Sequence, residues 1–259
     1  MVIKFGPAGL GSVKNVEARL EEYSKLGFKA ATFAFTYGAY LKKKEDAVRI
    51  GKSAKKFGID LSIHAPYWIN LNSKEKAKIE ASKKRVLKSL EIGTWLKAKE
   101  VIIHAGFYSG MEKEIAYENI KKQILELQKI RKEKKYTPQI CVETIGKINV
   151  FGSAEEVAQL VKDTQCGFCL DFAHILAREK KVDIQKIKRL FPQKKWHCHF
   201  SGIVYGEKGE KHHRLTTKKE WKELLDSMPK NKSVTIINES PNPVADSSVG
   251  LEIYSTKLL

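Results

Sequence analysis

Eight short runs rich in β-branched and aliphatic residues recur along the chain, and no other feature of the sequence constrains the fold as strongly. Each run is typical of a β-strand that is apolar enough to be covered on both faces, as the strands of a parallel sheet are. The runs are "VIKFG" from residue 2, "AATFAF" from 30, "DLSIH" from 60, "EVIIH" from 100, "QICVE" from 139, "GFCLD" from 167, "WHCHF" from 196 and "VTIINE" from 234. We therefore expect eight strands distributed along the whole chain.

The segments between these runs have helical periodicity and recognisable helix ends. Two capping boxes and two glycine stops are present: Ser153 with Glu156, Thr217 with Glu220, Gly27 and Gly58. Eight strand-helix units without a Pro/Gly/Ser-rich linker favour an α/β fold, a single (β/α)8 TIM barrel domain over residues 1–259. The alternative is a doubly wound sheet, which would want a G-x-G-x-x-G motif after the first strand, and "GPAGLG" does not match that spacing.

Six consecutive predicted strands end in a residue that can bind a metal ion. In chain order these are His64, His104, Glu143, Asp171, His199 and Glu239. The carboxyl ends of barrel strands meet at one face, so the six side chains should enter one pocket. A single strand-end histidine or carboxylate is more often structural, but six together would repel one another and lose hydration unless cations neutralised them. The pattern therefore predicts a metal centre.

Further ligands follow the strands. His174 comes three residues after Asp171, and the loop after the seventh strand carries Glu210, His212 and His213. The six strand-end residues together with His174, Glu210 and His212 make nine nitrogen and oxygen ligands. One tetrahedral zinc ion uses only four ligands, so we expect two or three ions. Such a cluster can activate water and stabilise the leaving oxygen of a phosphoryl displacement.

The net charge of +18 is high enough to attract a polyanion such as nucleic acid, although many of the lysines occupy polar helix faces. No apolar run reaches the length of a membrane span and no signal peptide is evident, so we expect a cytoplasmic protein without a membrane partner. Cys141, Cys166, Cys169 and Cys198 are expected to be buried free thiols, because the lone C-x-x-C has no second pair at zinc-ribbon spacing.

The segments "SIHAPYWINL", "VIIHAG", "CVETIG", "CLDFAH", "HCHFSG", "EKGEKHH" and "INES" resemble the motifs of the endonuclease IV family, in order, spacing and ligand type. The resemblance implies a xylose isomerase-like barrel with two to three Zn²⁺ ions, some of which Mn²⁺ could replace. It implies three ligand sets that share residues. These are His64, His104 and Glu143 for the first ion, Glu143, Asp171, His199 and Glu239 for the second, and His174, Glu210 and His212 for the third.

The same resemblance implies an apurinic/apyrimidinic endonuclease of base-excision repair, which hydrolyses double-stranded DNA on the 5′ side of an abasic site. Glu143, Asp171 and Glu239 would be its catalytic residues, and Tyr67 and Trp68 would contact DNA at the lesion. Glu210 stands where the family usually has aspartate, and the loop after the second strand, "TYGAYLKK", does not match the family's DNA-penetrating loop. We expect a monomer, which leaves the basic rim free to dock on DNA.

A metal-dependent sugar isomerase or epimerase of the same barrel superfamily is the alternative function. Such an enzyme would also place carboxylates and histidines around a divalent ion at the strand ends, but it would need fewer ligands. His174, Glu210 and His212, together with the positive charge, favour the nuclease. His197 lies deeper on the strand face of His199 and is expected to support the ligands, whereas His213 is a candidate phosphate contact.

Overall fold

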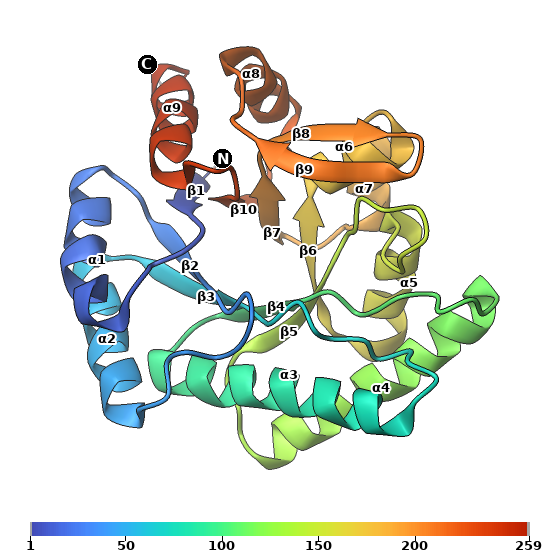
Figure 1. The fold of residues 1–259 in the computed structure, drawn as a ribbon. Coiled ribbons are helices and arrows are strands. Elements are labelled where there is room, and N and C mark those ends of the chain that lie inside the picture. Colours follow the sequence, from blue (N-terminus) through green and yellow to red (C-terminus); the bar gives the residue numbers. More distant parts are fainter. Residues whose placement is uncertain (1, 258–259) are drawn as a thin grey trace.

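The computed structural model describes residues 2–257 and contains the eight predicted strands in one parallel sheet. In the order in which they pair, the strands are β1 (Val2–Pro7), β10 (Ser233–Asn238), β7 (Lys195–Phe200), β6 (Gly167–Asp171), β5 (Gln139–Glu143), β4 (Glu100–Ile103), β3 (Asp60–His64) and β2 (Ala30–Ala34). The sheet curls into a nearly closed barrel with helices on its outside (Figure 1), which confirms the predicted TIM barrel.

The barrel closes between β1 and β2, the two ends of the sheet order. The amide of Gly9 donates to the carbonyl of Thr32 over 2.9 Å, and the amide of Lys29 donates to the carbonyl of Phe5 over 3.0 Å. A Cβ atom on Gly6 would lie only 1.7 Å from the carbonyl oxygen of Ala30. Glycine is therefore required at residue 6 for the two strands to approach each other.

Helices alternate with the strands around the barrel, as predicted. They are α1 (Val16–Lys25), α2 (Lys44–Phe57), α3 (Lys76–Leu96), α4 (Lys113–Glu133), α5 (Ala154–Thr164), α6 (Phe172–Glu179), α7 (Ile184–Leu190), α8 (Lys218–Ser227) and α9 (Pro243–Thr256), with a short 3₁₀ turn at Val13–Asn15. Both capping boxes form, at the starts of α5 and α8. Gly58 ends α2 in the left-handed conformation, and Gly27 follows α1 with a φ of +86°.

Alternate residues of each strand point into the barrel, and the others pack against the helices. On β4 and β5, Val101 and Val142 belong to the large outer core, whereas Ile102 and Cys141 form a small inner cluster with Cys169 of β6. All four cysteines are buried and free, as expected. The strand-end ligands continue the inward-pointing series, so the candidate centre lies directly above this inner cluster.

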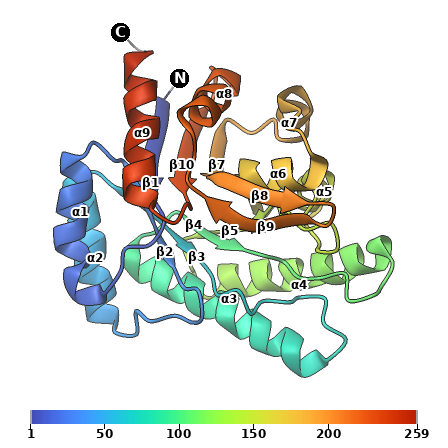
Figure 2. The same ribbon diagram turned by 45° about the horizontal axis from the view of Figure 1, so that its top comes forward.

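The segment after β7 is an antiparallel hairpin rather than the expected loop. It consists of β8 (Gly202–Gly206) and β9 (Gly209–Arg214), and it lies across α6 (Figure 2), where Ile203 packs on Ala173 and Ala177. His212 pairs with Val204 but Glu210 pairs with Tyr205, so Lys211 is the extra residue of a β-bulge. This bulge decides which side chains of β9 face the barrel.

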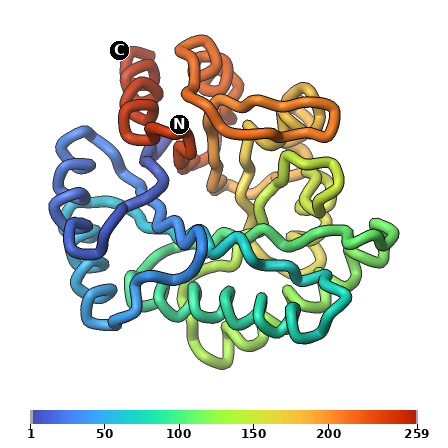
Figure 3. The backbone as a smooth tube through the Cα atoms, in the orientation of Figure 1, coloured from blue at the N-terminus to red at the C-terminus, as the bar shows by residue number. Residues whose placement is uncertain are grey.

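The first strand, β1, and the last helix, α9, lie on the same side of the molecule (Figure 3). The amide of Ile3 in β1 donates to the hydroxyl of Tyr254 in α9 over 3.3 Å, which joins the first strand to the last helix. Within residues 2–257, we find no helix whose length and apolar character would let it cross a bilayer.

Candidate metal centre

Glu143 is the centre of the strand-end cluster and is fully buried at the end of β5. Its Oε2 lies 3.0 Å from Nε2 of His64, the last residue of β3, and 3.1 Å from Nε2 of His104, which follows β4. One ligand atom from each of these three residues lies within 4.8 Å of the others. Three neighbouring strands thus bring the set predicted for the first ion into one place.

A second group shares Glu143 and extends toward β6, β7 and β10. Nδ1 of His199 lies 2.9 Å from Oε1 of Glu143 and 3.4 Å from Oε1 of Glu239. Asp171 completes this group, and ligand atoms of the four residues lie within 4.8 Å of one another. His104 and Glu239 each stand one residue beyond their strands, so the predicted strand ends were one residue too long at these two positions.

The third group shares only His174 with the predicted set, because Asp171 and His213 stand in it in place of Glu210 and His212. Asp171 caps α6 by accepting a hydrogen bond of 2.7 Å from the amide of His174, and Nε2 of His174 lies 3.4 Å from Oε2 of Glu210. The histidine that joins Asp171 and His174 is His213, whose ring centre lies 5.2 Å from that of His174. His212, the predicted ligand, is exposed and belongs to none of the ligand groups among the described residues.

The bulge at Lys211 explains this difference. In a regular strand Glu210 and His212 would share a face, but the extra residue puts Glu210 and His213 on the side toward α6 instead. His213 is opposite Ile203, which packs on α6, and its Nδ1 lies 2.5 Å from the hydroxyl of Ser201. The sequence pattern alone carries no signal for this bulge.

Two supporting residues were not singled out from the sequence. The carbonyl of Thr144 lies 2.9 Å from Nδ1 of His174, and its hydroxyl accepts a hydrogen bond of 2.9 Å from the amide of Asp171. Arg178 donates to the carbonyls of Ile145 and Val150 in the loop after β5. These bonds fix the loop that follows Glu143 beneath the hairpin.

Protons supply the positive charge of the cluster when no ion is bound. Burial alone would raise the pKa of Glu143, but the charge of His199 and the hydrogen bond from His104 outweigh it and hold this pKa well below its ordinary value. Burial works in the opposite direction on His174, yet Asp171 and Glu143 raise the pKa of His174 to about 9. The pKa of Glu239 is lowered to about 2 because His199 overcomes the effect of burial.

The donor set fits divalent metal ions. Oδ2 of the fully buried Asp171 has no hydrogen-bond partner among residues 2–257, although a buried carboxylate oxygen normally requires one. Imidazole nitrogen and carboxylate oxygen are ligands of Zn²⁺ and Mn²⁺, and without thiolate they are typical of sites that keep a position open for water. The three overlapping groups would hold more than one ion.

Tyr67 and Trp68 lie in the loop after β3, beside the cluster. The Tyr67 ring centre is 5.6 Å from that of His64 and 5.7 Å from that of His104. Tyr67 is 51% exposed and Trp68 is 61% exposed, so neither is held in the core. Burial and the charge of Glu239 raise the pKa of Tyr67 to about 12, so its hydroxyl keeps its proton at neutral pH.

The sequence model of the family described as "Xylose isomerase-like TIM barrel" matches residues 20–253. The chain belongs to this family. An uncharacterized protein of Methanocaldococcus jannaschii is 29% identical over 98% of both chains. A probable endonuclease 4 of Mesomycoplasma hyopneumoniae is 32% identical over 121 residues, which span 45% of this chain and 42% of that protein.

Solved structures of the xylose isomerase-like family include both kinds of enzyme that the sequence suggested. Endonuclease IV of Thermus thermophilus superposes with a TM-score of 0.72 at 22% identity and 98% coverage of both chains. D-psicose 3-epimerase of Clostridium cellulolyticum superposes with a TM-score of 0.69 at 15% identity, also over 98% of both chains. At these identities the two superpositions establish the shared barrel and do not choose between the activities.

Proposed function

We propose that this member of the xylose isomerase-like family is a metal-dependent endonuclease that cleaves DNA on the 5′ side of abasic sites. The observation that carries the proposal is the number of ligands. Three groups overlap at Glu143 and Asp171, and Glu210 adds a further carboxylate next to His174. A single ion uses four to six ligands, whereas this set suits the two or three ions that phosphodiester hydrolysis can use.

Bound ions would polarise the scissile phosphate, lower the pKa of a water molecule and neutralise the leaving oxygen. Residues of the chain prepare the site for this chemistry. Glu143 fixes the rings of His64, His104 and His199 by direct contacts to both of its oxygens. Glu239 remains ionised at neutral pH, since its pKa is about 2, and its side chain is 20% exposed.

The rim of the centre has the properties of a DNA-binding surface. Exposed lysines lie in the loops after β2, β3 and β5 and in the hairpin, at Lys42, Lys43, Lys74, Lys147, Lys208 and Lys211. Lysine ammonium groups bind backbone phosphates without reading bases. Tyr67 and Trp68 are exposed in the loop after β3, where an aromatic ring could replace the missing base in the stack. The local likeness to the probable endonuclease 4 supports the same interpretation.

A nicking assay tests the proposal. Protein loaded with Zn²⁺ or Mn²⁺ should cut a duplex that carries one tetrahydrofuran abasic analogue, on the 5′ side of the lesion and leaving a 3′ hydroxyl. Glu143→Gln should reduce cutting to background because it removes the carboxylate common to two ligand groups. Glu133→Gln, which changes an exposed carboxylate on α4, is the matched control and should cut normally. Metal-loaded, folded protein that leaves this duplex intact would refute the proposal.

The second candidate is a sugar epimerase or isomerase, and one observation favours it. Glu143, Asp171, His199 and Glu239 form a four-residue group that could hold one ion without help from the others. One ion is enough to polarise a carbonyl while a carboxylate moves the adjacent proton. If the protein converts a ketose such as D-psicose and leaves the abasic duplex uncut, this candidate replaces the nuclease.

A further inference from the structure

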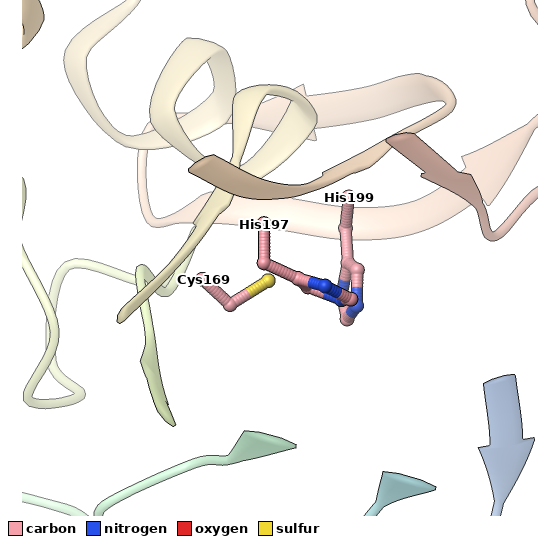
Figure 4. Close-up of side chains that lie close together, drawn as sticks. All are labelled: Cys169, His197 and His199. Atoms are coloured by element: carbon pink, nitrogen blue, oxygen red, sulfur yellow. The ribbon is translucent and has the colours of Figure 1, made fainter. Parts of the chain in front are cut away.

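A fourth group of potential ligands lies inside the barrel, below the strand-end cluster. It consists of Cys169 on β6 and His197 and His199 on β7. In the parallel register Cys169 is beside His197, and all three side chains point inward because they occupy alternate positions of their strands. Figure 4 shows the sulfur of Cys169 directed toward the two rings. One ligand atom from each residue lies within 4.8 Å of the others.

Each of the two histidines has a ring nitrogen without a hydrogen-bond partner in this group. Nε2 of His197 and Nε2 of His199 are buried and have no hydrogen-bond partner within residues 2–257. The side chain of His197 is 5% exposed and that of His199 is 0% exposed, so bulk water does not satisfy them. A buried ring nitrogen without a partner is unusual, and two beside one thiol require an explanation.

The opposite nitrogen of each ring faces a carboxylate. Nδ1 of His199 lies 2.9 Å from Oε1 of Glu143, and Nδ1 of His197 lies 3.7 Å from Oε2 of Glu100. A carboxylate at Nδ1 favours a proton on that nitrogen and leaves the lone pair on Nε2. Histidines that bind metals are usually oriented in this way, with a carboxylate on the nitrogen that does not bind.

We propose that Cys169, His197 and His199 form a further site for a thiophilic divalent ion, Zn²⁺ in the first instance, which shares His199 with the strand-end cluster. On binding, the Cys169 thiol loses its proton to solvent and its sulfur forms a bond to the ion, while each Nε2 donates its lone pair and each Nδ1 keeps its proton. Because His199 is charged in the metal-free cluster, its Nε2 also loses a proton, and the change releases two protons for each ion bound.

One residue of this site, His197, can be reached from the end of the barrel away from the strand-end cluster. A cavity of about 530 Å³ opens there, and its lining includes His197, Glu100 and Cys141 together with four lysines, but neither Cys169 nor His199. An ion can therefore approach His197 without crossing the cluster around Glu143.

The inference does not depend on the nuclease proposal, because neither Cys169 nor His197 belongs to the strand-end groups. The two sites are nevertheless linked through one ring. A neutral imidazole has a single lone pair, so His199 can bind through Nε2 here or through Nδ1 in the group with Glu143 and Glu239, but not both. An ion held by Cys169 would thus withdraw His199 from the strand-end cluster.

Cobalt titration of the full-length, metal-stripped protein tests the site. Co²⁺ bound to a thiolate has an intense charge-transfer band in the near ultraviolet, which nitrogen and oxygen ligands do not give. We expect this band in the wild type and in Glu239→Gln, and its complete loss in Cys169→Ser. Cys141→Ser is the matched control, since Cys141 is a buried neighbour in the same inner cluster but belongs to no ligand group among the described residues. That variant should keep the band.

A second variant guards against a folding defect in Cys169→Ser. Glu100→Gln should weaken the cobalt affinity measured from the band by about 10- to 100-fold, because Glu100 only orients His197. Absence of the band both in folded wild type and in folded Glu239→Gln, each saturated with Co²⁺, would overturn the proposal. Persistence of the full band in folded Cys169→Ser would overturn it as well. The readout is optical, so failure of the nicking assay leaves this test unaffected.

Discussion

Raising the pH of the metal-free protein above 6.5 should weaken its fold, and His174 accounts for a measurable part of the loss. Asp171 and Glu143 raise the pKa of His174 to about 9 against the effect of burial, from 6.5 in an unperturbed histidine. The folded state therefore binds this proton more tightly than the unfolded state does. The resulting stabilisation is fully present below pH 6.5 and disappears as the pH rises through 9.

The magnitude follows from the pKa difference. The shift is worth about 3 kcal/mol in full, and about 2 kcal/mol of it should be lost between pH 6.5 and about 8.5. Burial makes solvent screening small, because the side chain of His174 is only 4% exposed. Zinc-saturated protein should lack this decline, since the ion replaces the proton and binds more tightly as protons leave.

Urea unfolding of wild type and His174→Gln at several pH values measures the effect. Between pH 6.5 and about 8.5, the free energy of unfolding of metal-free wild type should fall by about 2 kcal/mol more than that of His174→Gln. The same titration in saturating Zn²⁺ is the control for the role of the ion. Parallel pH curves for the two metal-free proteins would refute the argument that Asp171 and Glu143 hold a proton on His174.

Three further predictions use unfolding free energies as well. Burial raises the pKa of Glu100 from 4.5 to about 7, so the free energy of unfolding of metal-free wild type should fall by up to about 2 kcal/mol as the pH rises from 4.5 to about 7. The free energy of unfolding of Glu100→Gln should fall less over the same range, and equal decreases would contradict this. Arg178→Met should lower the free energy of unfolding by about 3 kcal/mol, because three carbonyls after β5 lose their hydrogen-bond donor. Arg189→Met, the control on the exposed side of α7, should change it by less than about 0.5 kcal/mol. Ser153→Ala should cost about 1 kcal/mol by removing the cap of α5, and an unchanged midpoint would show that the cap adds nothing.

Much of the fold could be predicted because local signals and the global arrangement agree. The strand from Gln139 to Glu143 is apolar at alternate outward positions and ends in a carboxylate, so one short segment specifies both its packing and its place in the cluster. Ser153 with Glu156 fixes the start of α5 through side-chain bonds to its own backbone, which need no tertiary context.

The hairpin after β7 could not be predicted in the same way. Its second strand, Gly209–Arg214, contains no aliphatic residue, and its strand conformation depends on pairing with β8. The register of that pairing determines whether His212 or His213 faces the ligand cluster, and the spacing of the ligands in the sequence does not predict this register. Similarly, the direction of the His197 ring depends on Glu100, which comes from a strand nearly a hundred residues earlier.

The extra residue at Lys211 affects how this family is compared and how it can change. If the hairpin gained or lost one residue, the inward-facing imidazole of β9 would change from His213 to His212. The two sequences would otherwise be nearly identical. Two relatives aligned letter by letter across this hairpin can therefore have unlike residues at the same point in space. A single-codon insertion or deletion here would exchange one histidine for another beside His174, which is a short evolutionary step between different metal requirements.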